Sequence, residues 1–420
     1  MSHTLKPELV IINAVLPDLP GLYSVAVRKG NIIAVDLQRD NDPAVAAGVA
    51  TEDANGRLVL PGFVDSHVHL DKSCLMSCCQ GPGDGLKGAI EAVSRAKGSF
   101  TMDDVYSRGA KTLEKAILQG TTHMRTHVEV DPRVGLRSFE AIKALKQDYA
   151  YAIDLSICVF PQEGLTNDPG TESLLLEALD NGADLIGGCP YTDSDPQAQI
   201  DRIFDIATER NIDIDFHLDF DIDPKGALLF EICRQTTSHS WKGRVTIGHV
   251  TKLSAMDEQA FQEAANCLTA SGVAVTALPA TDLYLNGRNH SFNTPRGIAP
   301  VHRLVSQYNA QASLATNNVL NPFTPFGDCS LLRIANLYAN AMHVGPEEFG
   351  LCLELVTYQP SRIMRLVDYG IHPGAPADLI ILDATDTSSA LAEISPVIAA
   401  FKNGRLSFRR TLPTLCRPTH

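Results

Sequence analysis

Eight apolar segments of strand length recur through the middle of the chain, and helical patterns separate them. The segments lie at residues 63–70, 123–130, 153–160, 185–189, 212–219, 245–250, 273–279 and 313–319. Amphipathic stretches with helical spacing lie between them, such as 102–118, 197–210, 256–270 and 299–308. This alternation predicts an α/β protein folded as a (β/α)8 TIM barrel. A doubly wound open sheet is the second interpretation, although the glycine-rich phosphate loop typical of that fold is absent.

The two ends of the chain share a different, β-rich pattern. Short strand candidates separated by Gly and Pro occupy residues 9–12, 23–27 and 31–35, and the C-terminal candidates are 377–382 and 397–406, the latter around an Asn-Gly turn. Two β-rich ends around a different middle predict one small β-sandwich domain built from both termini. We assign residues 1–60 plus 375–420 to this domain and residues 61–374 to the barrel.

Composition excludes several classes of partner. The 420 residues carry a net charge of −14, which argues against nucleic acid and anionic membrane as partners. No run of about 18 apolar residues predicts a transmembrane helix, and residues 1–7 lack the apolar core of a secretory signal, so a cytoplasmic location is expected. Cys74, Cys78 and Cys79 fit no common structural zinc spacing and are interpreted as reduced thiols.

The end of the first barrel strand carries two histidines, His67 and His69. Residues i and i+2 of a strand point to the same side, so both rings can reach one ion. Imidazole is the commonest metal ligand at neutral pH. The alternative is a pair of ordinary surface histidines.

Further histidines follow other strands at the same end of the predicted barrel. His217 ends the fifth strand and His249 ends the sixth. Catalytic residues of such barrels lie at the carboxyl ends of the strands, so these rings should converge on the mouth. Three neutral imidazoles with room for water form an open site, where a divalent ion lowers the pKa of water toward about 7. The pattern predicts hydrolytic attack on an electrophilic carbon.

Several stretches, in order, resemble the amidohydrolase superfamily, and within it the cytosine deaminase-like branch. They are the Pro-Gly-Phe-Val-Asp-Ser-His-Val-His run at 61–69 and the segments 123–128, 159–164, 283–288, 295–298 and 325–327. The Asp-Lys-Ser at 71–73 is also similar to the N-isopropylammelide amidohydrolases, which strip amines from s-triazine rings. The resemblance covers most of the chain and implies a homo-oligomer.

The resemblance implies specific roles for matching residues. His67, His69 and His217 would bind one divalent metal ion, zinc or iron, and His249 would orient or deprotonate the hydrolytic water. Gln162 matches the glutamine that hydrogen-bonds the pyrimidine ring, because a primary amide offers both a donor and an acceptor. The alternative for Gln162 is a loop residue that caps backbone groups.

Two positions depart from the family pattern. Asn317 stands where the superfamily has a metal-binding aspartate, and Thr316 and Asn318 beside it also differ from the deaminase pattern. The Asn317 carbonyl can still contact a metal, but it carries no charge and is not a useful base. Phe220 replaces the glutamate that protonates the ring in cytosine deaminases, so cytosine deamination itself is not expected.

Lys72 and Asp219 are the candidates to replace the missing acid and base. A desolvated lysine near a cation can exchange a proton, and Asp219 follows His217 by two residues. The alternatives are a solvated loop cation for Lys72 and a structural ion-pair partner for Asp219. Arg288, in a loop expected at 282–292, should help to shape the substrate pocket.

The sequence therefore predicts a metal-dependent hydrolase of a carbon–nitrogen bond in a small nitrogen heterocycle, cytosine- or triazine-like. The substrate would carry an exocyclic amine or a cyclic amide. Asn317 and Phe220 motivate the alternative, a catalytically inactive barrel that binds a small ligand. A nucleic-acid-editing zinc deaminase is set aside because its His-x-Glu and Pro-Cys-x-x-Cys motifs are absent.

Overall fold

The computed structural model describes residues 6–39, 48–77, 79 and 85–417. Eight parallel strands in chain order form one sheet, as the sequence predicted. They are β6 (Phe63–Val68), β7 (Thr121–Glu129), β8 (Asp154–Phe160), β9 (Leu185–Gly188), β10 (Asp213–Leu218), β11 (Val245–His249), β12 (Ala274–Ala277) and β13 (Ala312–Leu314). Every residue of β6 and β7 is buried, as expected for parallel strands covered on both faces.

The barrel closes where its last strand meets its first. The Asn317 N–H donates to the His67 carbonyl at 2.8 Å, and the His69 N–H donates to the Asn317 carbonyl at 3.0 Å. The hydroxyls of Ser66 and Ser313 lie 2.9 Å apart just before this point. These contacts between segments about 250 residues apart bring the carboxyl ends of the first and last strands together.

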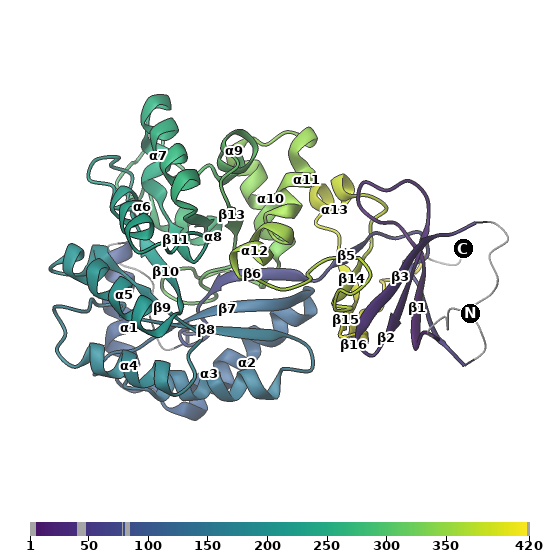
Figure 1. Cartoon of the computed structure of the whole chain (residues 1–420), viewed down its shortest axis with the longest axis horizontal. Coiled ribbons are helices and arrows are strands. Elements are labelled where there is room, and N and C mark those ends of the chain that lie inside the picture. Colours follow the sequence, from purple (N-terminus) through teal and green to yellow (C-terminus); the bar gives the residue numbers. More distant parts are fainter. Residues whose placement is uncertain (1–5, 40–47, 78, 80–84, 418–420) are drawn as a thin grey trace.

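Helices surround the barrel (Figure 1). They are α1 (Leu86–Lys97), α2 (Met102–Leu118), α3 (Arg137–Asp148), α4 (Thr171–Asp180), α5 (Pro196–Arg210), α6 (Leu229–Ser238), α7 (Glu258–Ser271), α8 (Pro279–Leu285), α9 (Val301–Tyr308), α10 (Leu331–Met342), α11 (Phe349–Glu354), α12 (Tyr358–Ile363) and α13 (Thr387–Glu393), with 3-10 turns at Pro190–Thr192, Thr251–Ala255 and Pro346–Glu348.

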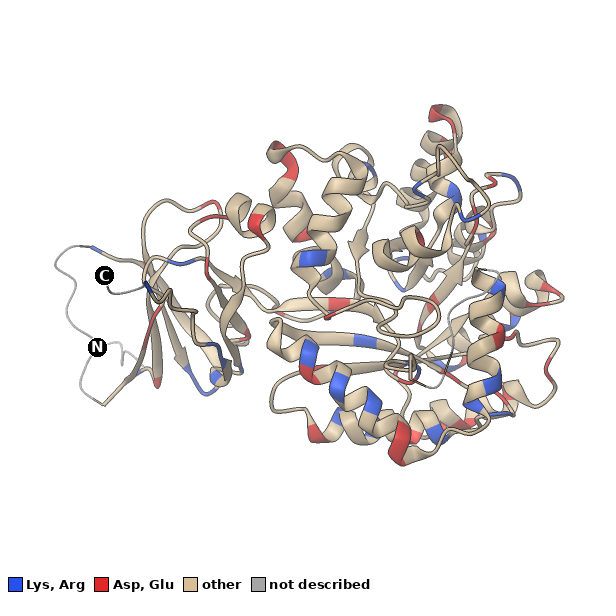
Figure 2. Cartoon of the chain, turned by 180° about the vertical axis from the view of Figure 1, so that it is seen from behind, with Lys and Arg blue, Asp and Glu red and all other residues tan. Residues whose placement is uncertain are grey.

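Polar caps begin several of these helices. The Thr101 side chain accepts from the Asp104 N–H at the start of α2, and Asp195 and Asp257 cap α5 and α7 in the same way. Figure 2 shows acidic and basic residues interspersed along the helices around the barrel.

The chain ends form two further four-stranded sheets beside the barrel. One has the order β3-β2-β1-β4 and the other β16-β15-β14-β5. Their strands are β1 (Leu9–Ala14), β2 (Tyr23–Arg28), β3 (Asn31–Leu37), β4 (Ala50–Asp53), β5 (Val59–Pro61), β14 (Leu379–Leu382), β15 (Val397–Lys402) and β16 (Arg405–Arg409). Ile11 and Val25 from the first sheet share one apolar core with Leu379 and Phe401 from the second. The predicted β domain formed from both termini is therefore present.

The β domain and the barrel are joined at the start of β6. Only Gly62 separates β5 from β6, and a Cβ at Gly62 would lie 2.2 Å from the Thr122 side chain, so this crossing requires glycine. Nearby, the buried Lys402 ammonium binds Asp154 of β8 at 2.6 Å and Asp378 at 2.5 Å. A strand and an ion-pair cluster thus fasten the domain to the barrel.

The structure bears on two predictions from composition. Among the described residues, no helix has both the length and the apolar character needed to cross a bilayer. Cys78 lies outside the described residues. None of the potential metal-ligand groups in the described part of the chain contains a cysteine, so nothing there assigns Cys74 or Cys79 to a metal.

Candidate metal centre and cavity at the barrel mouth

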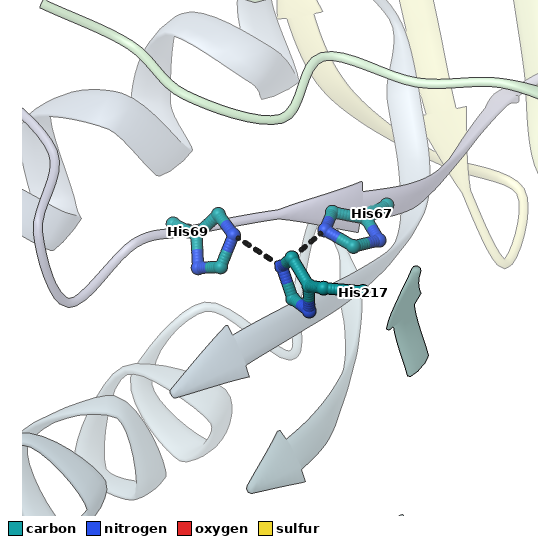
Figure 3. Close-up of side chains that lie close together, drawn as sticks. All are labelled: His67, His69 and His217. Atoms are coloured by element: carbon teal, nitrogen blue, oxygen red, sulfur yellow. Dashed lines mark hydrogen bonds between the residues drawn. The ribbon is translucent and has the colours of Figure 1, made fainter. Parts of the chain in front are cut away.

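Three histidines converge at the carboxyl ends of β6 and β10. His67 Nε2 and His69 Nε2 each lie 3.1 Å from His217 Nε2. Figure 3 shows the three rings pointing toward one another from two segments of the barrel. Gly248 leaves the space for this arrangement, because a Cβ there would lie 3.1 Å from the His67 ring. The structure thus brings together the three histidines that the sequence grouped.

The chemistry of this triad fits a divalent metal ion. Burial lowers the pKa of His67, His69 and His217 well below the ordinary range, and crowding by neighbouring histidines adds to it, so the rings are neutral. Three nitrogens that each lie about 2.0–2.1 Å from one tetrahedral ion would be about 3.3 Å apart, close to the spacing observed here. The lone pairs of neutral imidazoles facing one another at this distance are best satisfied by a shared cation.

Asn317 lies beside the triad. Its side chain is fully buried, and both its Oδ1 and its Nδ2 lack a hydrogen-bond partner among the described residues. The residue adopts a left-handed φ of 62°. Asp219 (φ 51°) and His249 (φ 70°) also do so at the ends of their strands. Such backbone strain in residues other than glycine often marks functional positions.

A second buried group lies behind His67, and sequence reasoning did not assign it a role. The His127 ring stacks on His67 with centroids 3.7 Å apart, and His127 Nε2 lies 3.5 Å from Asp215 Oδ2. Arg125 Nη1 donates to the same oxygen at 2.8 Å. Burial acts to raise the pKa of Asp215, but His127 and Arg125 lower it below the ordinary value. The sequence signal that could have pointed to His127 was its position near the end of the second barrel strand.

A cavity of about 250 Å³ opens beside the triad. His69, His217, His249, Lys72 and Gln162 line it, together with the apolar residues Leu86, Phe220, Leu285 and Phe323. Only about 10 Å³ accepts the centre of a water molecule, which is room for about one water. A ring-sized ligand therefore requires wall side chains to move. Leu86, Phe220 and Leu285 also border a larger outer cavity, in which about 790 Å³ accepts the centre of a water molecule.

His249 is held by a carboxylate that the sequence placed in a loop. Its Nδ1 lies 2.7 Å from Asp282 Oδ1, and the other Asp282 oxygen accepts from the Leu278 N–H. Asp282 belongs to α8, so the loop expected at 282–292 begins only after Leu285, which corrects that prediction. Burial raises the pKa of Asp282. The contact leaves His249 Nε2 as the nitrogen available to the cavity.

Lys72 and Gln162 meet in the wall of the cavity. Lys72 Nζ donates to Gln162 Oε1 at 3.0 Å and to Glu129 Oε1 at 2.7 Å. It also lies 4.4 Å from the Phe323 ring centroid. Lys72 is 1 % exposed, so the alternative of a solvated loop cation is wrong. Gln162 is buried as well, and its Nε2 lies 3.5 Å from Cys189 Sγ.

Two other predicted site residues lie farther from the cavity. Both carboxylate oxygens of Asp219 accept backbone N–H donors, from Leu228 at 2.9 Å and Leu229 at 3.0 Å, at the start of α6. Burial raises the pKa of Asp219 to about 6. Arg288 lines the outer cavity instead, where it donates to the Tyr284 carbonyl.

The Phe220 ring faces His249. The two ring centroids are 4.5 Å apart and the rings are perpendicular. Phe220 lines both cavities and offers no proton.

Four groups of potential metal ligands occur in the described part of the chain. In the group of Glu129, Asp131 and Glu163 the Lys97 ammonium pairs with all three carboxylates, and Lys402 pairs with both aspartates of the group that includes His123. In the third group Arg125 binds Asp215. Of these four groups, the triad of His67, His69 and His217 is the one in which no residue forms an ion pair with a lysine or arginine.

Known proteins resemble this chain over nearly its whole length. The N-isopropylammelide isopropyl amidohydrolase of Pseudomonas sp. (strain ADP) is 27% identical over 410 residues, 95% of this chain and 96% of that protein. The pterin deaminase of Rhizobium rhizogenes (strain K84) is 27% identical over 98% of this chain and 94% of its own length. The crystal structure of 5-methylcytosine deaminase from Klebsiella pneumoniae liganded with 5-fluorocytosine superposes with a TM-score of 0.90 at 28% identity, covering 97% of this chain and 99% of that one.

A family model matches residues 58–407, which contain the whole barrel and most of the C-terminal sheet. The match includes the His-x-His strand, His217, His249 and Asn317. The protein therefore belongs to the amidohydrolase family and is a hydrolase of carbon–nitrogen bonds.

Proposed function

We propose that this amidohydrolase removes an exocyclic amine from a small nitrogen heterocycle, or opens a cyclic amide in one. One divalent ion, zinc or iron, would be held by His67, His69, His217 and the Asn317 carbonyl oxygen. The observation that carries the proposal is the convergence of three neutral imidazole nitrogens beside a small cavity that His69 and His217 line. The names of the relatives, which act on triazines, pterins and cytosines, support this substrate class.

The metal would supply a water activated for attack near neutral pH. The protein's own contribution begins with His249. Because Asp282 holds Nδ1, the Nε2 atom can take a proton from the attacking water and return it to the departing nitrogen. The buried Asp282 carboxylate stabilises the imidazolium that forms in between, as in other carboxylate–histidine pairs.

Lys72 and Gln162 would bind the heterocycle. Both lie in the cavity wall, where Phe220 offers no proton and the Lys72 ammonium has three N–H donors. We therefore favour Lys72 as the group that donates to a ring nitrogen or carbonyl oxygen. Asp219 is better explained as the residue that holds the start of α6, because both its oxygens are engaged there. Arg288 would act at the entrance, in the outer cavity.

The inactive-barrel alternative rests on Asn317 and Phe220 alone. The intact triad, the paired His249 and the family assignment favour an active enzyme. A homo-oligomer and a cytoplasmic location stay predictions, as does the absence of nucleic-acid and membrane partners.

Elemental analysis of purified, untreated protein tests the proposal, combined with a screen for release of ammonia or amine. The panel would contain aminated pyrimidines, s-triazines and pterins. We expect about one zinc or iron per chain and turnover of at least one heterocycle that is lost on chelation and recovered on metal addition. Turnover by metal-free protein, or no metal even after reconstitution, would contradict it.

A further inference from the structure

Glu129, at the end of β7, is shared between two buried lysines. Its Oε1 accepts from Lys72 at 2.7 Å, and its Oε2 accepts from Lys97 at 2.8 Å. All three side chains are 3 % exposed or less. A buried ammonium is stable only where carboxylates compensate its charge. Lys72, which faces the cavity, therefore depends on Glu129.

Lys97 holds Glu129 from the side away from the cavity. It also pairs with Asp131, just after β7, and with Glu163, just after β8. Although burial acts to lower it, these three carboxylates raise the pKa of Lys97, so its ammonium stays charged. Lys97 is the last residue of α1, and Leu86, the first residue of that helix, lines the cavity. If Glu129 turned away, Lys97 would keep Asp131 and Glu163, whereas Lys72 would lose the one carboxylate with which it forms an ion pair in the described structure.

The Lys72 ammonium determines how the Gln162 amide is oriented. An ammonium has three donors and no acceptor, so the group it contacts at 3.0 Å must be the Gln162 oxygen. The Gln162 amino group is then turned away from Lys72, toward Cys189. The opposite orientation would place an NH₂ group against the ammonium. Chemistry therefore fixes the amide assignment, which atom positions alone often do not.

We propose that Glu129 and Lys97 are positioning residues for substrate recognition: they hold Lys72 against the Gln162 oxygen, so that this wall of the cavity offers donors to the substrate. The inference rests on the proposed function, because it takes Lys72 and Gln162 to face the substrate. It assigns the substrate exocyclic carbonyl oxygens, rather than exocyclic amino groups, on this side. An edge of amino groups would meet only donors.

Removal of either positioning residue should release Lys72. In Lys97→Met, three carboxylates within 4.8 Å of one another lose their central ammonium, and Lys72 is drawn toward them and away from Gln162. In Glu129→Gln, which is nearly isosteric, Lys72 loses its charged partner. Gln162 can then turn either its oxygen or its amino group toward the ligand.

The test compares two triazine probes, cyanuric acid with three carbonyl oxygens and melamine with three amino groups, by calorimetric titration of the metal-loaded protein. We expect the parent to prefer cyanuric acid by about tenfold or more, and both variants to lose most of that preference. For the substrate found in the screen, KM should rise more than kcat falls, because positioning of the ligand is what is lost.

Lys402→Met is the matched control. Lys402 is also a buried ammonium between two carboxylates, but it lies at the junction with the β domain. Its loss should lower the melting temperature by an amount similar to Lys97→Met and leave the ratio of the two probe affinities unchanged. A parallel loss of the ratio in all three variants would indicate general destabilisation and overturn the proposal.

A crystal structure of ligand-free Glu129→Gln or Lys97→Met protein reads the contact directly. Loss of the contact between Lys72 Nζ and Gln162 Oε1 supports the proposal, and its retention in both variants overturns it, whether or not either probe binds. If the parent binds and hydrolyses a heterocycle and the variants keep its probe preference, this inference is wrong but the proposed function stands. A parent that turns over no heterocycle contradicts the proposed function instead.

Discussion

Asn317 and His67 are joined through their backbones at 2.8 Å, at the point where the last strand of the barrel meets the first. The next bond, from His69 to the Asn317 carbonyl, encloses the same corner. The amide side chain is therefore fixed beside the His-x-His pair by main-chain contacts rather than by its own hydrogen bonds, which are lacking in the described structure. Because the main chain holds this position, the Asn317 side chain can be substituted and the new side chain will still lie beside His67 and His69.

Asn317→Asp should make metal binding tighter and the metal-free protein less stable. A carboxylate adds a charged ligand, but without metal it is a buried charge with no partner, costing about 1–3 kcal/mol. Thermal unfolding with and without zinc measures both effects, and resistance to a chelator should rise about tenfold. Unchanged chelator resistance would place Asn317 outside the metal site. Deamination that appears from near zero would favour an inactive parent, whereas loss of an existing activity would favour an altered enzyme.

His217→Ala should abolish both metal binding and turnover. His217 Nε2 is the atom that lies 3.1 Å from both other triad nitrogens, so its removal leaves two imidazole ligands on one segment and the uncharged Asn317 amide. Metal content per chain after gel filtration provides the measurement. His290→Ala, an exposed histidine bordering the outer cavity, is the control and should keep its metal. Turnover by metal-free His217→Ala protein would be incompatible with the proposed site.

Asp282→Asn should lower kcat by about a hundredfold or more while metal content stays unchanged. The asparagine can still accept from Leu278 N–H, so α8 keeps its start, but the charge that stabilises protonated His249 is lost. Steady-state kinetics with metal analysis of the same sample separate the two effects. A kcat close to that of the parent would remove His249 from proton transfer.

Asp219→Asn separates a structural role from a catalytic one. Asparagine tolerates the left-handed backbone but keeps only one acceptor oxygen for the two N–H groups that begin α6. We expect a loss of about 1 kcal/mol in unfolding free energy. Turnover should stay within about threefold of the parent, whereas a proton-transfer residue would cost about a hundredfold. Chemical denaturation measures the loss of stability and steady-state kinetics measures kcat, and the two results together distinguish the structural role from the catalytic one.

Glu163→Gln should change how stability depends on pH. Burial, and after it the nearby Glu129, raises the pKa of Glu163 from 4.5 to about 7. The folded carboxyl binds its proton more readily than the unfolded one, so its contribution is favourable at low pH and is lost as the pH rises through about 7. The unfolding free energy of Glu163→Gln relative to the parent should therefore increase between pH 5 and pH 8, on the order of 1 kcal/mol or more. Glu172→Gln, which removes a partly exposed carboxylate paired with Arg202, serves as control, and a flat difference for Glu163→Gln would contradict the expectation.

The fold could be predicted because its elements have local signals. Each barrel strand is a short apolar run, and α2 spans the predicted residues 102–118 because Thr101 caps it and its apolar positions follow the helical period. The triad could be predicted for the same reason. His67, His69 and His217 end strands, and parallel strands of a barrel bring their carboxyl ends together.

The partners of the site residues had no such signal. Asp282 meets His249 from a seven-residue helix 33 residues away, and Glu129 meets Lys72 across 57 residues. Such pairs depend on side-chain packing between elements, which no spacing along the chain reports. Asp219 looked catalytic because it follows His217 by two residues. Its left-handed backbone instead places the carboxylate on N–H groups up to ten residues later.

The pairing of β5 with β14 also sets an order of assembly on the ribosome. Leu60 is three residues before the first strand of the barrel, yet its partner Ile380 is made about 320 residues later. The segment that leads into β6 therefore emerges with an open edge and keeps it until almost the whole polypeptide has been synthesised. The strand that carries His67 is the first part of the barrel to be translated, and the strand that pairs with its lead-in segment is among the last.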